Sequence, residues 1–267
     1  MVNKLVTIPK RPVWRRPPKD QRPVNKITYN FGRYAESEFL NALAGKKVII
    51  VGPAAYMLGK KKGEFINTFD YIVRVNHAIP IEHPADYGSR TDILYHILSR
   101  RNLASATKKL IGREEILLWK RSNLKWLVSR HDVISRRIRE MGPKLKGSFP
   151  WVCIRAKFYM SVRQSVKRSP NTGIVAIAHL LTSQLKELHI MGFDFYRTGV
   201  YPGYGNFRPG EEAGSINKNW HETESQVDYL RKLVTRDVRL KPDKTLSDIL
   251  AGEPIPEPEE GEPVCEI

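Results

Sequence analysis

Hydrophobic positions along this chain form short continuous runs, separated by segments in which apolar and polar residues alternate at helical spacing. The runs at residues 46–52, 69–76 and 92–98 read KKVIIVG, FDYIVRVN and DILYHIL. Nearly continuous apolar runs of this length are typical of parallel strands that are covered on both faces. The pattern predicts an α/β fold with a mostly parallel sheet flanked by helices.

The stretch 169–194, SPNTGIVAIAHLLTSQLKELHIMGFD, predicts a turn, then a helix, then a buried strand. Pro170 and Asn171 favour the turn, and Asn171 or Thr172 can cap the helix. Gly173 lets a ligand approach the backbone, and a capped helix N-terminus with free N–H groups suits a phosphate. Taken alone, the stretch is more often an ordinary αβ unit of a core. The inward face of the helix is apolar: Ile174, Ala178, Leu181 and Leu185.

The remaining elements follow from the same periodicities. We expect a helix from about residue 34 that stops near Gly45, a strand at 116–119, a basic helix at 131–141 and a helix at 222–234. Residues 151–154 predict either a strand or the start of a lid that reaches residue 166. The loop FYRTGVYPGYGNF at 195–207 is too rich in glycine and proline for a helix or a central strand.

Composition and charge narrow the class of protein. The 267 residues carry a formal net charge of +17, which favours an anionic partner without choosing between a nucleotide, a nucleic acid, an anionic glycan and a membrane surface. Only two cysteines occur, Cys153 and Cys265, so we expect no structural disulfide and a reducing compartment. No apolar run is long enough for a transmembrane anchor, and residues 1–16 lack an apolar h-region, so we expect neither an anchor nor a signal peptide. We expect a cytoplasmic or otherwise non-secretory soluble protein, compatible with a bacterial or viral source.

The distribution of charge and proline predicts the domain organisation. Residues 1–30 form a basic flexible arm, residues 31–251 a single domain with a basic insert at about 98–168, and residues 252–267 an acidic disordered tail. Residues 98–145 hold thirteen Lys and Arg against four Asp and Glu. A solvated surface and an anion-binding patch explain this segment equally well.

Polar residues at strand ends and in loops suggest a site. Arg74 and Asn76 end the second strand, and parallel strands bring such ends to one crevice. His221 precedes a helix, and its ordinary pKa suits proton transfer near neutrality. Taken singly, such a histidine more often caps a helix or faces solvent, and a loop tyrosine more often packs. The other candidates are hydrogen-bonding groups of the turn and the loop: Asn171, Thr172, Tyr196, Tyr201 and Tyr204.

Signatures of other chemistries are missing from the sequence. No DxD motif follows a strand, and there is no CxxC pair and no HExxH, so we expect no metal site. The absence of GxSxG disfavours a serine hydrolase. Glycosyl transfer without a metal needs phenols, amides and cations to stabilise a leaving phosphate, and this sequence offers them.

Two groups of motifs resemble a known family. KKVIIVGPAAYMLG, FDYIVRVNHAIP and DYGSRTD together resemble the large sialylmotif of the sialyltransferases of glycosyltransferase family 29. SPNTGIVAIAHLL and LKELHIMGFDF resemble the small sialylmotif, and the segment through GFDFYRTGVY is also similar to bacterial sialyltransferases of family 42. The resemblance covers about residues 46–233 with a weak middle. It implies a Rossmann-like variant glycosyltransferase-A fold, a CMP-sugar donor, inverting transfer, no metal and no cofactor besides the donor substrate.

The resemblance also implies roles for residues. Asn76 matches an asparagine that contacts the cytidine nucleotide, and His221 matches the proposed general base. Tyr196 and Tyr201 match tyrosines that hydrogen-bond the leaving phosphate, although their spacing differs. The turn of the small motif matches at Asn171, Thr172 and Gly173, which implies that these residues hold the donor. The candidates for donor binding at the first strand end are Gly52, Pro53 and Ala54.

The sequence departs from the family after its first strand. The family has an asparagine after the glycine, where this chain has Pro53. The acids Glu222 and Glu224 are not at the usual distance from the histidine, so a related CMP-ulosonic acid such as CMP-Kdo is also a candidate donor. The cysteine pair of secreted members is absent as well.

Three functional hypotheses follow. The first is an inverting, metal-independent glycosyltransferase that moves sialic acid, or a related ulosonic acid such as Kdo, from a CMP-activated acidic sugar to the hydroxyl of a glycan acceptor; the chain's charge would suit an anionic acceptor. The second is a nucleic-acid-binding protein that uses the basic arm and residues 98–145. It is disfavoured because no RRM, KH or zinc-finger pattern occurs. The third is a catalytically inactive nucleotide-binding relative, which the missing asparagine after Gly52 favours.

Overall fold

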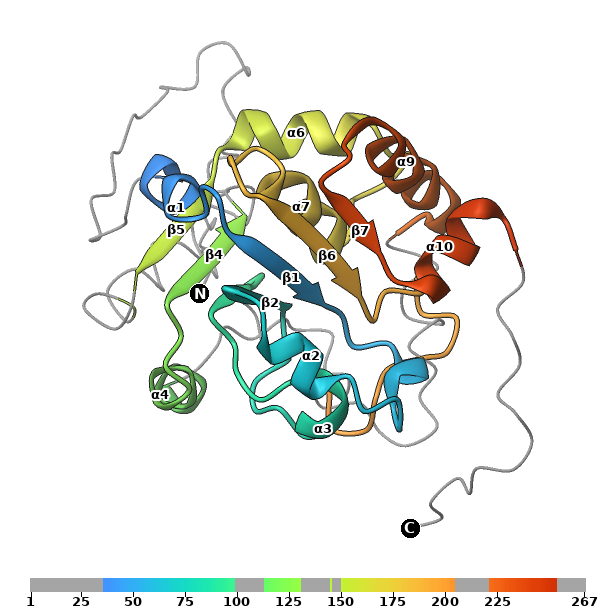
Figure 1. Ribbon diagram of the computed structural model, residues 1–267. Coiled ribbons are helices and arrows are strands. Elements are labelled where there is room, and N and C mark those ends of the chain that lie inside the picture. Colours follow the sequence, from blue (N-terminus) through green and yellow to red (C-terminus); the bar gives the residue numbers. More distant parts are fainter. Residues whose placement is uncertain (1–35, 99–112, 131–144, 146–149, 205–220, 254–267) are drawn as a thin grey trace, which may run out of the picture. The chain divides into compact units, whose positions relative to one another are not determined.

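The structure is a computed structural model that describes residues 36–98, 113–130, 145, 150–204 and 221–253 (Figure 1). The chain divides into two units, Met1–Asn30, which lies outside the described residues, and Phe31–Ile267, to which all described elements belong. Among the described residues, seven strands form one sheet in the order β5-β4-β3-β2-β1-β6-β7, and each neighbouring pair is parallel. The strands are β1 (Lys47–Val51), β2 (Tyr71–Val75), β3 (Ile93–Tyr95), β4 (Trp126–Arg130), β5 (Trp151–Ile154), β6 (Glu187–Met191) and β7 (Leu240–Pro242).

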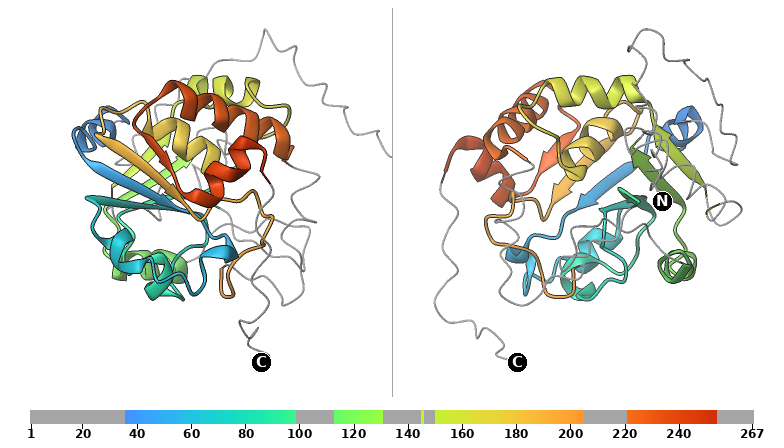
Figure 2. Two further views of the ribbon diagram at one scale, coloured as in Figure 1. Left: turned by 45° about the vertical axis from the view of Figure 1, so that its right-hand side comes forward. Right: turned by 180° about the vertical axis from the view of Figure 1, so that it is seen from behind.

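Helices cover both faces of the sheet (Figures 1 and 2). On one face lie α1 (Glu36–Ala42), α6 (Ala156–Gln164), α7 (Thr172–Leu180), α9 (Thr223–Arg236) and α10 (Lys244–Ala251). On the other lie η2 (Ala55–Met57), α2 (Gly63–Asn67), α3 (Pro84–Tyr87) and α4 (Arg113–Arg121). Successive side chains of a strand point to opposite faces. Val48 and Ile50 of β1 therefore join the first core, while Ile49 and Val51 join the second.

The order of the strands creates a crevice beside β1. From β1 the chain builds the sheet outward to β5, and then returns to place β6 on the other side of β1. The connections that leave the carboxyl ends of β1 and β6 consequently diverge, and ligands of open α/β sheets bind at such a switch point.

Glycines let the two strand ends approach each other at this point. A Cβ on Gly52 would lie 2.1 Å from the carbonyl oxygen of Gly192, a distance that no side chain tolerates. Gly192 has a φ of +72°, which other residues rarely adopt. The two backbones lie too close together for a Cβ at this point. This explains why a glycine follows directly after β1 and another directly after β6.

The fold class is the one predicted from the sequence: an α/β structure with a parallel sheet between helices. The strands expected at residues 46–52, 69–76 and 92–98, and the strand expected at the end of the stretch 169–194, are confirmed as β1, β2, β3 and β6. The helices expected after residue 34, after Asn171 and at 222–234 are confirmed as α1, α7 and α9. Residues 151–154 form strand β5 and are followed by helix α6, so the strand alternative holds there.

The strand expected at residues 116–119 is wrong, because this segment lies in helix α4. Acidic residues occupy the first turn of α4 and basic residues the last, which stabilises a helix through its dipole. Ile116 and Trp119, three positions apart, are buried, while Leu117 is exposed. This is helical periodicity, and the four-residue apolar run concealed it.

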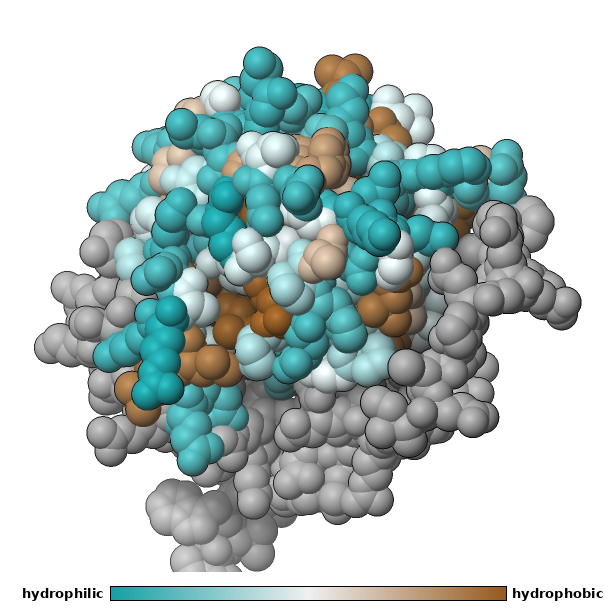
Figure 3. All heavy atoms as spheres, turned by 60° about the horizontal axis from the view of Figure 1, so that its bottom comes forward, coloured by the Kyte–Doolittle hydropathy of each residue, from teal (hydrophilic) through white to brown (hydrophobic). Residues whose placement is uncertain are grey.

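The segment at 98–168, expected as a basic insert, supplies two strands of the main sheet, β4 and β5, in its described part. The sequence reasoning also missed β4, α6, β7 and α10. The expected helix at 131–141 and the expected arm at 1–30 lie outside the described residues, as does nearly all of the expected tail. No helix of the described part is both long and apolar enough to cross a membrane. Hydrophilic residues dominate the described surface in Figure 3, with small hydrophobic groups between them.

Candidate functional site

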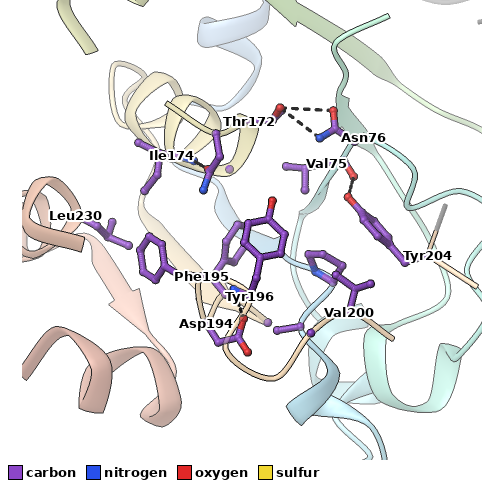
Figure 4. A pocket seen from close by; sticks show the side chains of 17 residues that line it. Val75, Asn76, Thr172, Ile174, Asp194, Phe195, Tyr196, Val200, Tyr204 and Leu230 are labelled. Carbon is purple, nitrogen blue, oxygen red and sulfur yellow. Dashed lines mark hydrogen bonds between the residues drawn. The ribbon is translucent and has the colours of Figure 1, made fainter. Parts of the chain in front are cut away.

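A pocket opens at the switch point between β1 and β6 (Figure 4). Five parts of the chain form it: the end of β1, the end of β2, the N-terminus of α7, the loop after β6, and one residue of α9. The lining residues are Pro53, Ala54, Val75, Asn76, Asn171, Thr172, Gly173, Ile174, Gly192, Phe193, Asp194, Phe195, Tyr196, Gly199, Val200, Tyr204 and Leu230.

Asn76 connects the end of β2 to the start of α7. Its φ is +49°, in the left-handed region that asparagine tolerates better than most residues, and its N–H donates to the carbonyl of Tyr95 at 2.8 Å. The side-chain nitrogen of Asn76 donates to the hydroxyl of Thr172 at 3.2 Å (Figure 4). Two polar side chains from distant segments thus meet at the rim of the pocket.

The bend at the start of α7, residues 171–173, presents the N-terminus of this helix to the pocket; it is called the bend before α7 below. Asn171 caps the helix, since its side-chain oxygen accepts from the N–H of Ile174 at 2.8 Å. A Cβ on Gly173 would lie 2.4 Å from the ring of Phe193, so only glycine fits there. A helix N-terminus carries roughly half a positive charge. The bend can therefore accommodate an anionic group beside Asn76.

Tyr196 stands in the pocket, with its ring pointing from the loop after β6 toward Thr172 (Figure 4). Both Phe195 and Tyr196 have positive φ values, +57° and +67°. Asp194 holds this turn, because its Oδ1 accepts from the N–H of Tyr196 at 2.9 Å. Asp194 is 2% exposed, and burial raises the pKa of its carboxyl above the ordinary value.

Tyr201 lies outside the pocket lining. It is 3% exposed and packs against the rings of Tyr87 and Tyr204, with centroid distances of 4.5 and 5.5 Å. Burial raises the pKa of Tyr201 to about 12. Tyr204 lines the pocket instead, and its hydroxyl donates to the carbonyl of Val75 at 3.0 Å.

Arg74 belongs to the scaffold and does not line the pocket. Its guanidinium is 1% exposed and donates to the hydroxyl of Thr91 at 3.1 Å and to the carbonyl of Gly88 at 3.2 Å. Burial lowers the pKa of Arg74 to about 10. The pair expected from the sequence at the end of β2 therefore separates, with Asn76 at the pocket and Arg74 anchoring the loop before β3.

His221 lies next to the bend but outside the pocket lining. Its Nδ1 is 2.6 Å from the carbonyl oxygen of Ser169, two residues before Asn171. A carbonyl oxygen can only accept, so Nδ1 carries a proton, and in the neutral ring the lone pair is on Nε2. This is the tautomer in which Nε2 acts as a base.

Gln226 ties the start of α9 to the same bend. It is 2% exposed, and its side-chain oxygen accepts from the N–H of Asn171 at 2.8 Å. Its side-chain nitrogen donates to the carbonyl of Glu222 at 3.1 Å. A single amide therefore bridges the backbone beside His221 and the backbone of the bend.

The structure brings together eight of the twelve residues predicted for the site: Pro53, Ala54, Asn76, Asn171, Thr172, Gly173, Tyr196 and Tyr204 line the pocket. Gly52 lies directly behind the lining, against Gly192 and Phe193. Sequence reasoning missed Asp194, Phe195, Leu230 and Gln226 as parts of the site. The position of Asp194 directly after a strand was the available signal, whereas a glutamine on the inward face of a helix gives none until its partner is known.

The pocket has few charges. Among the described lining residues, Asp194 is the one with an ionisable carboxylate, and none is a lysine, arginine or histidine. Within the described residues no group of three or more His, Cys, Asp and Glu side chains is placed to hold a metal ion. An anionic ligand would therefore be held here by backbone N–H groups, hydroxyls and amides.

Residues 20–136 match the family model described as glycosyltransferase family 29 (sialyltransferase). This match confirms the family resemblance predicted from the sequence, and it contains the ends of β1 and β2. The bend before α7 and His221 lie beyond the matched residues. No match was found among curated protein sequences.

Solved structures with similar folds include several sialyltransferases. One is the sialyltransferase Cst-II in complex with CMP, with a TM-score of 0.50 and 12% identity over 79% of this chain and 86% of that chain. Others are a mammalian sialyltransferase, with a TM-score of 0.49 and 16% identity over 78% of each chain, and CstII from Campylobacter jejuni in complex with the substrate analogue CMP-3FNeuAc, with a TM-score of 0.47 and 13% identity over 79% of this chain and 86% of that chain. At these identities the likeness concerns the fold alone.

Proposed function

We propose that this chain, whose residues 20–136 match the sialyltransferase family model, transfers a sialic acid, or a related ulosonic acid such as Kdo, from a CMP-sugar to a glycan hydroxyl. The reaction inverts the anomeric centre and needs no metal ion. The observation that carries the proposal is that Asn76, the bend before α7 and Tyr196 line one pocket. His221 lies beside them, because its ring is hydrogen-bonded to the carbonyl oxygen of Ser169, two residues before Asn171.

The donor lies with its phosphate at the N-terminus of α7. The free N–H groups of the first turn and the hydroxyl of Thr172 face this position, and Asn76 is bonded to that hydroxyl. The positive end of the helix dipole offsets the charge of the phosphate. Because the described lining contains no cation, these neutral donors carry the task that a metal ion performs in other transferases.

The transfer step uses His221 as the base. Nε2 of His221 takes the proton of the acceptor hydroxyl, and the acceptor oxygen forms a bond with the anomeric carbon. The bond from that carbon to the phosphate oxygen breaks, and CMP leaves with the electron pair. The phenol of Tyr196 donates to the oxygen on which negative charge grows, an effect of a few kcal/mol for each well-placed donor.

The experiment compares His221→Ala with His83→Ala in transfer from CMP-sialic acid. Nε2 of His83 lies 3.2 Å from the carbonyl oxygen of Pro202, and His83 does not line the pocket, so it serves as a matched control. We expect His221→Ala to stay folded and to keep CMP-dependent thermal stabilisation while transfer is lost, and His83→Ala to retain transfer. A chelator should leave wild-type transfer intact. Full transfer by His221→Ala would remove the base assignment.

A second candidate is a catalytically inactive relative that binds the nucleotide without turning it over. Pro53 supports this candidate, because it lines the pocket where the family resemblance implies an asparagine, and proline has neither a side-chain amide nor a backbone N–H. Selective thermal stabilisation by CMP over CDP, UDP, GDP and SAM, with no hydrolysis or transfer of the donor, would favour this candidate over the first.

A further inference from the structure

The loop after β6 holds two successive residues in an unfavourable backbone conformation. Phe195 and Tyr196 are not glycines, yet both have positive φ values, a backbone conformation that is strained for residues with a Cβ. Such a turn persists only where neighbouring groups fix it. The feature lies directly in the pocket, where Tyr196 presents its ring (Figure 4).

Asp194 and Thr198 hold this turn in place through hydrogen bonds. Oδ1 of Asp194 accepts from the N–H of Tyr196 at 2.9 Å, and Oδ2 accepts from the N–H of Thr198 at 2.7 Å and from its hydroxyl at 2.5 Å. The carboxylate thus closes the loop from both ends of the turn. Hydrogen bonds to an ionised acceptor are about twice as strong as neutral ones.

Thr198 also connects the loop to the sheet. Its hydroxyl oxygen accepts from the N–H of Tyr56 at 3.1 Å, and Tyr56 lies in η2, directly after β1. The hydroxyl of Tyr56 accepts from the N–H of Gly192 at 2.8 Å. The turn at Tyr196 is therefore attached both to β6, from which it emerges, and to the segment that follows β1.

We propose that Asp194 and Thr198 are positioning residues that place the phenol of Tyr196 in the pocket. The oxygens of Asp194 are engaged by the loop, so the carboxylate acts through Tyr196 and not on the substrate. The proposal rests on the proposed function for its kinetic consequence, but the placement of the ring is measurable without activity.

The central variant is Thr198→Val, which keeps the size of the side chain and removes both hydrogen bonds of the hydroxyl; Thr198→Ser is the matched control that keeps them. We expect Thr198→Val to lower kcat roughly tenfold with little change in KM for the donor, and Thr198→Ser to stay within about twofold of wild type. In a Tyr196→Phe background the same Thr198→Val change should have almost no further effect, because the group it positions is gone.

A second measurement reports the placement directly. With fluorotyrosine at position 196, the fluorine NMR resonance of the Thr198→Val protein should shift or broaden, while that of Thr198→Ser should match wild type. Asp194→Asn removes the negative charge and replaces one of the two accepting oxygens by an NH2 group, so it cannot accept from the N–H of Tyr196 and from both donors of Thr198 as the carboxylate does. This variant should give the same change in the resonance as Thr198→Val. An unchanged resonance in both variants, or an equal kinetic loss in the presence and absence of the Tyr196 hydroxyl, would overturn the proposal. A wild-type protein without transfer would instead refute the proposed function and leave the NMR comparison decisive for the positioning.

Discussion

Replacing Gln226 by methionine tests whether one buried amide sets the relation between the base and the donor-binding bend. Methionine has a similar length and volume but offers no hydrogen bond. The change leaves the N–H of Asn171 without its 2.8 Å partner, whereas the carbonyl of Glu222 retains the hydroxyl of Ser225 at 3.2 Å. An unsatisfied buried N–H costs about 1–3 kcal/mol of unfolding free energy, and because the N–H of Asn171 is part-buried we expect a loss near the lower end of that range.

Two assays read this change. Denaturant unfolding should show the lower free energy of unfolding, with a Tm lower by about 2–4 °C for each kcal/mol. Transfer assays should show a fall in kcat, because the N-terminus of α9, which follows His221, is no longer tied to the backbone of Asn171. Gln164→Met, on the exposed end of α6, is the matched control and should change stability by less than about 0.5 kcal/mol. If Gln226→Met matched the control in both assays, the hydrogen bonds of the Gln226 amide would contribute neither to stability nor to transfer, and the reasoning would be wrong.

Two further perturbations address other parts of the structure. Gly173→Ala places a methyl group 2.4 Å from the ring of Phe193, so we expect about 1–3 kcal/mol of destabilisation and loss of the thermal stabilisation by CMP; a variant that CMP stabilises like wild type would contradict the assignment of the bend. Glu36 is the second: burial opposes ionisation of its carboxyl, but hydrogen bonds from His179 and from the N–H of Arg155 outweigh burial and hold its pKa below the ordinary value. Its contribution is therefore present above the unfolded pKa and is lost as pH falls through the lower folded pKa, so stability measured from pH 7 toward acid should fall less steeply in Glu36→Gln than in wild type. Parallel acid limbs for the two proteins would show that Glu36 is not the group responsible.

The sequence was informative where periodicity and position acted together. Continuous apolar runs identified β1, β2, β3 and β6, and the rule that ligands bind beyond parallel strand ends placed Asn76 and the bend before α7 in one pocket. A run of four apolar residues, such as 116–119, does not by itself distinguish a strand from a helix. In α4 the acidic residues before the run and the basic residues after it favour the helix.

Contacts between distant segments were beyond the reach of the sequence. Tyr201 and Tyr204 lie three positions apart in one glycine-rich loop, and nothing local shows that the first is buried against Tyr87 while the second lines the pocket. Gln226 likewise gains its meaning from the N–H of Asn171, 55 positions earlier in the chain. These assignments depend on how the loop and α9 pack, which is a property of the whole fold.

The close approach of Gly52 and Gly192 has a consequence for how relatives of this protein can diverge. The base of the crevice consists of main chain against main chain, so amino-acid replacement there is not a route to a different shape. Replacement remains open along the sides, at positions such as Val200, Phe195 and Leu230. Relatives that use other substrates should therefore differ in the width of the pocket and in the chemistry of its sides, and should share the same pocket depth.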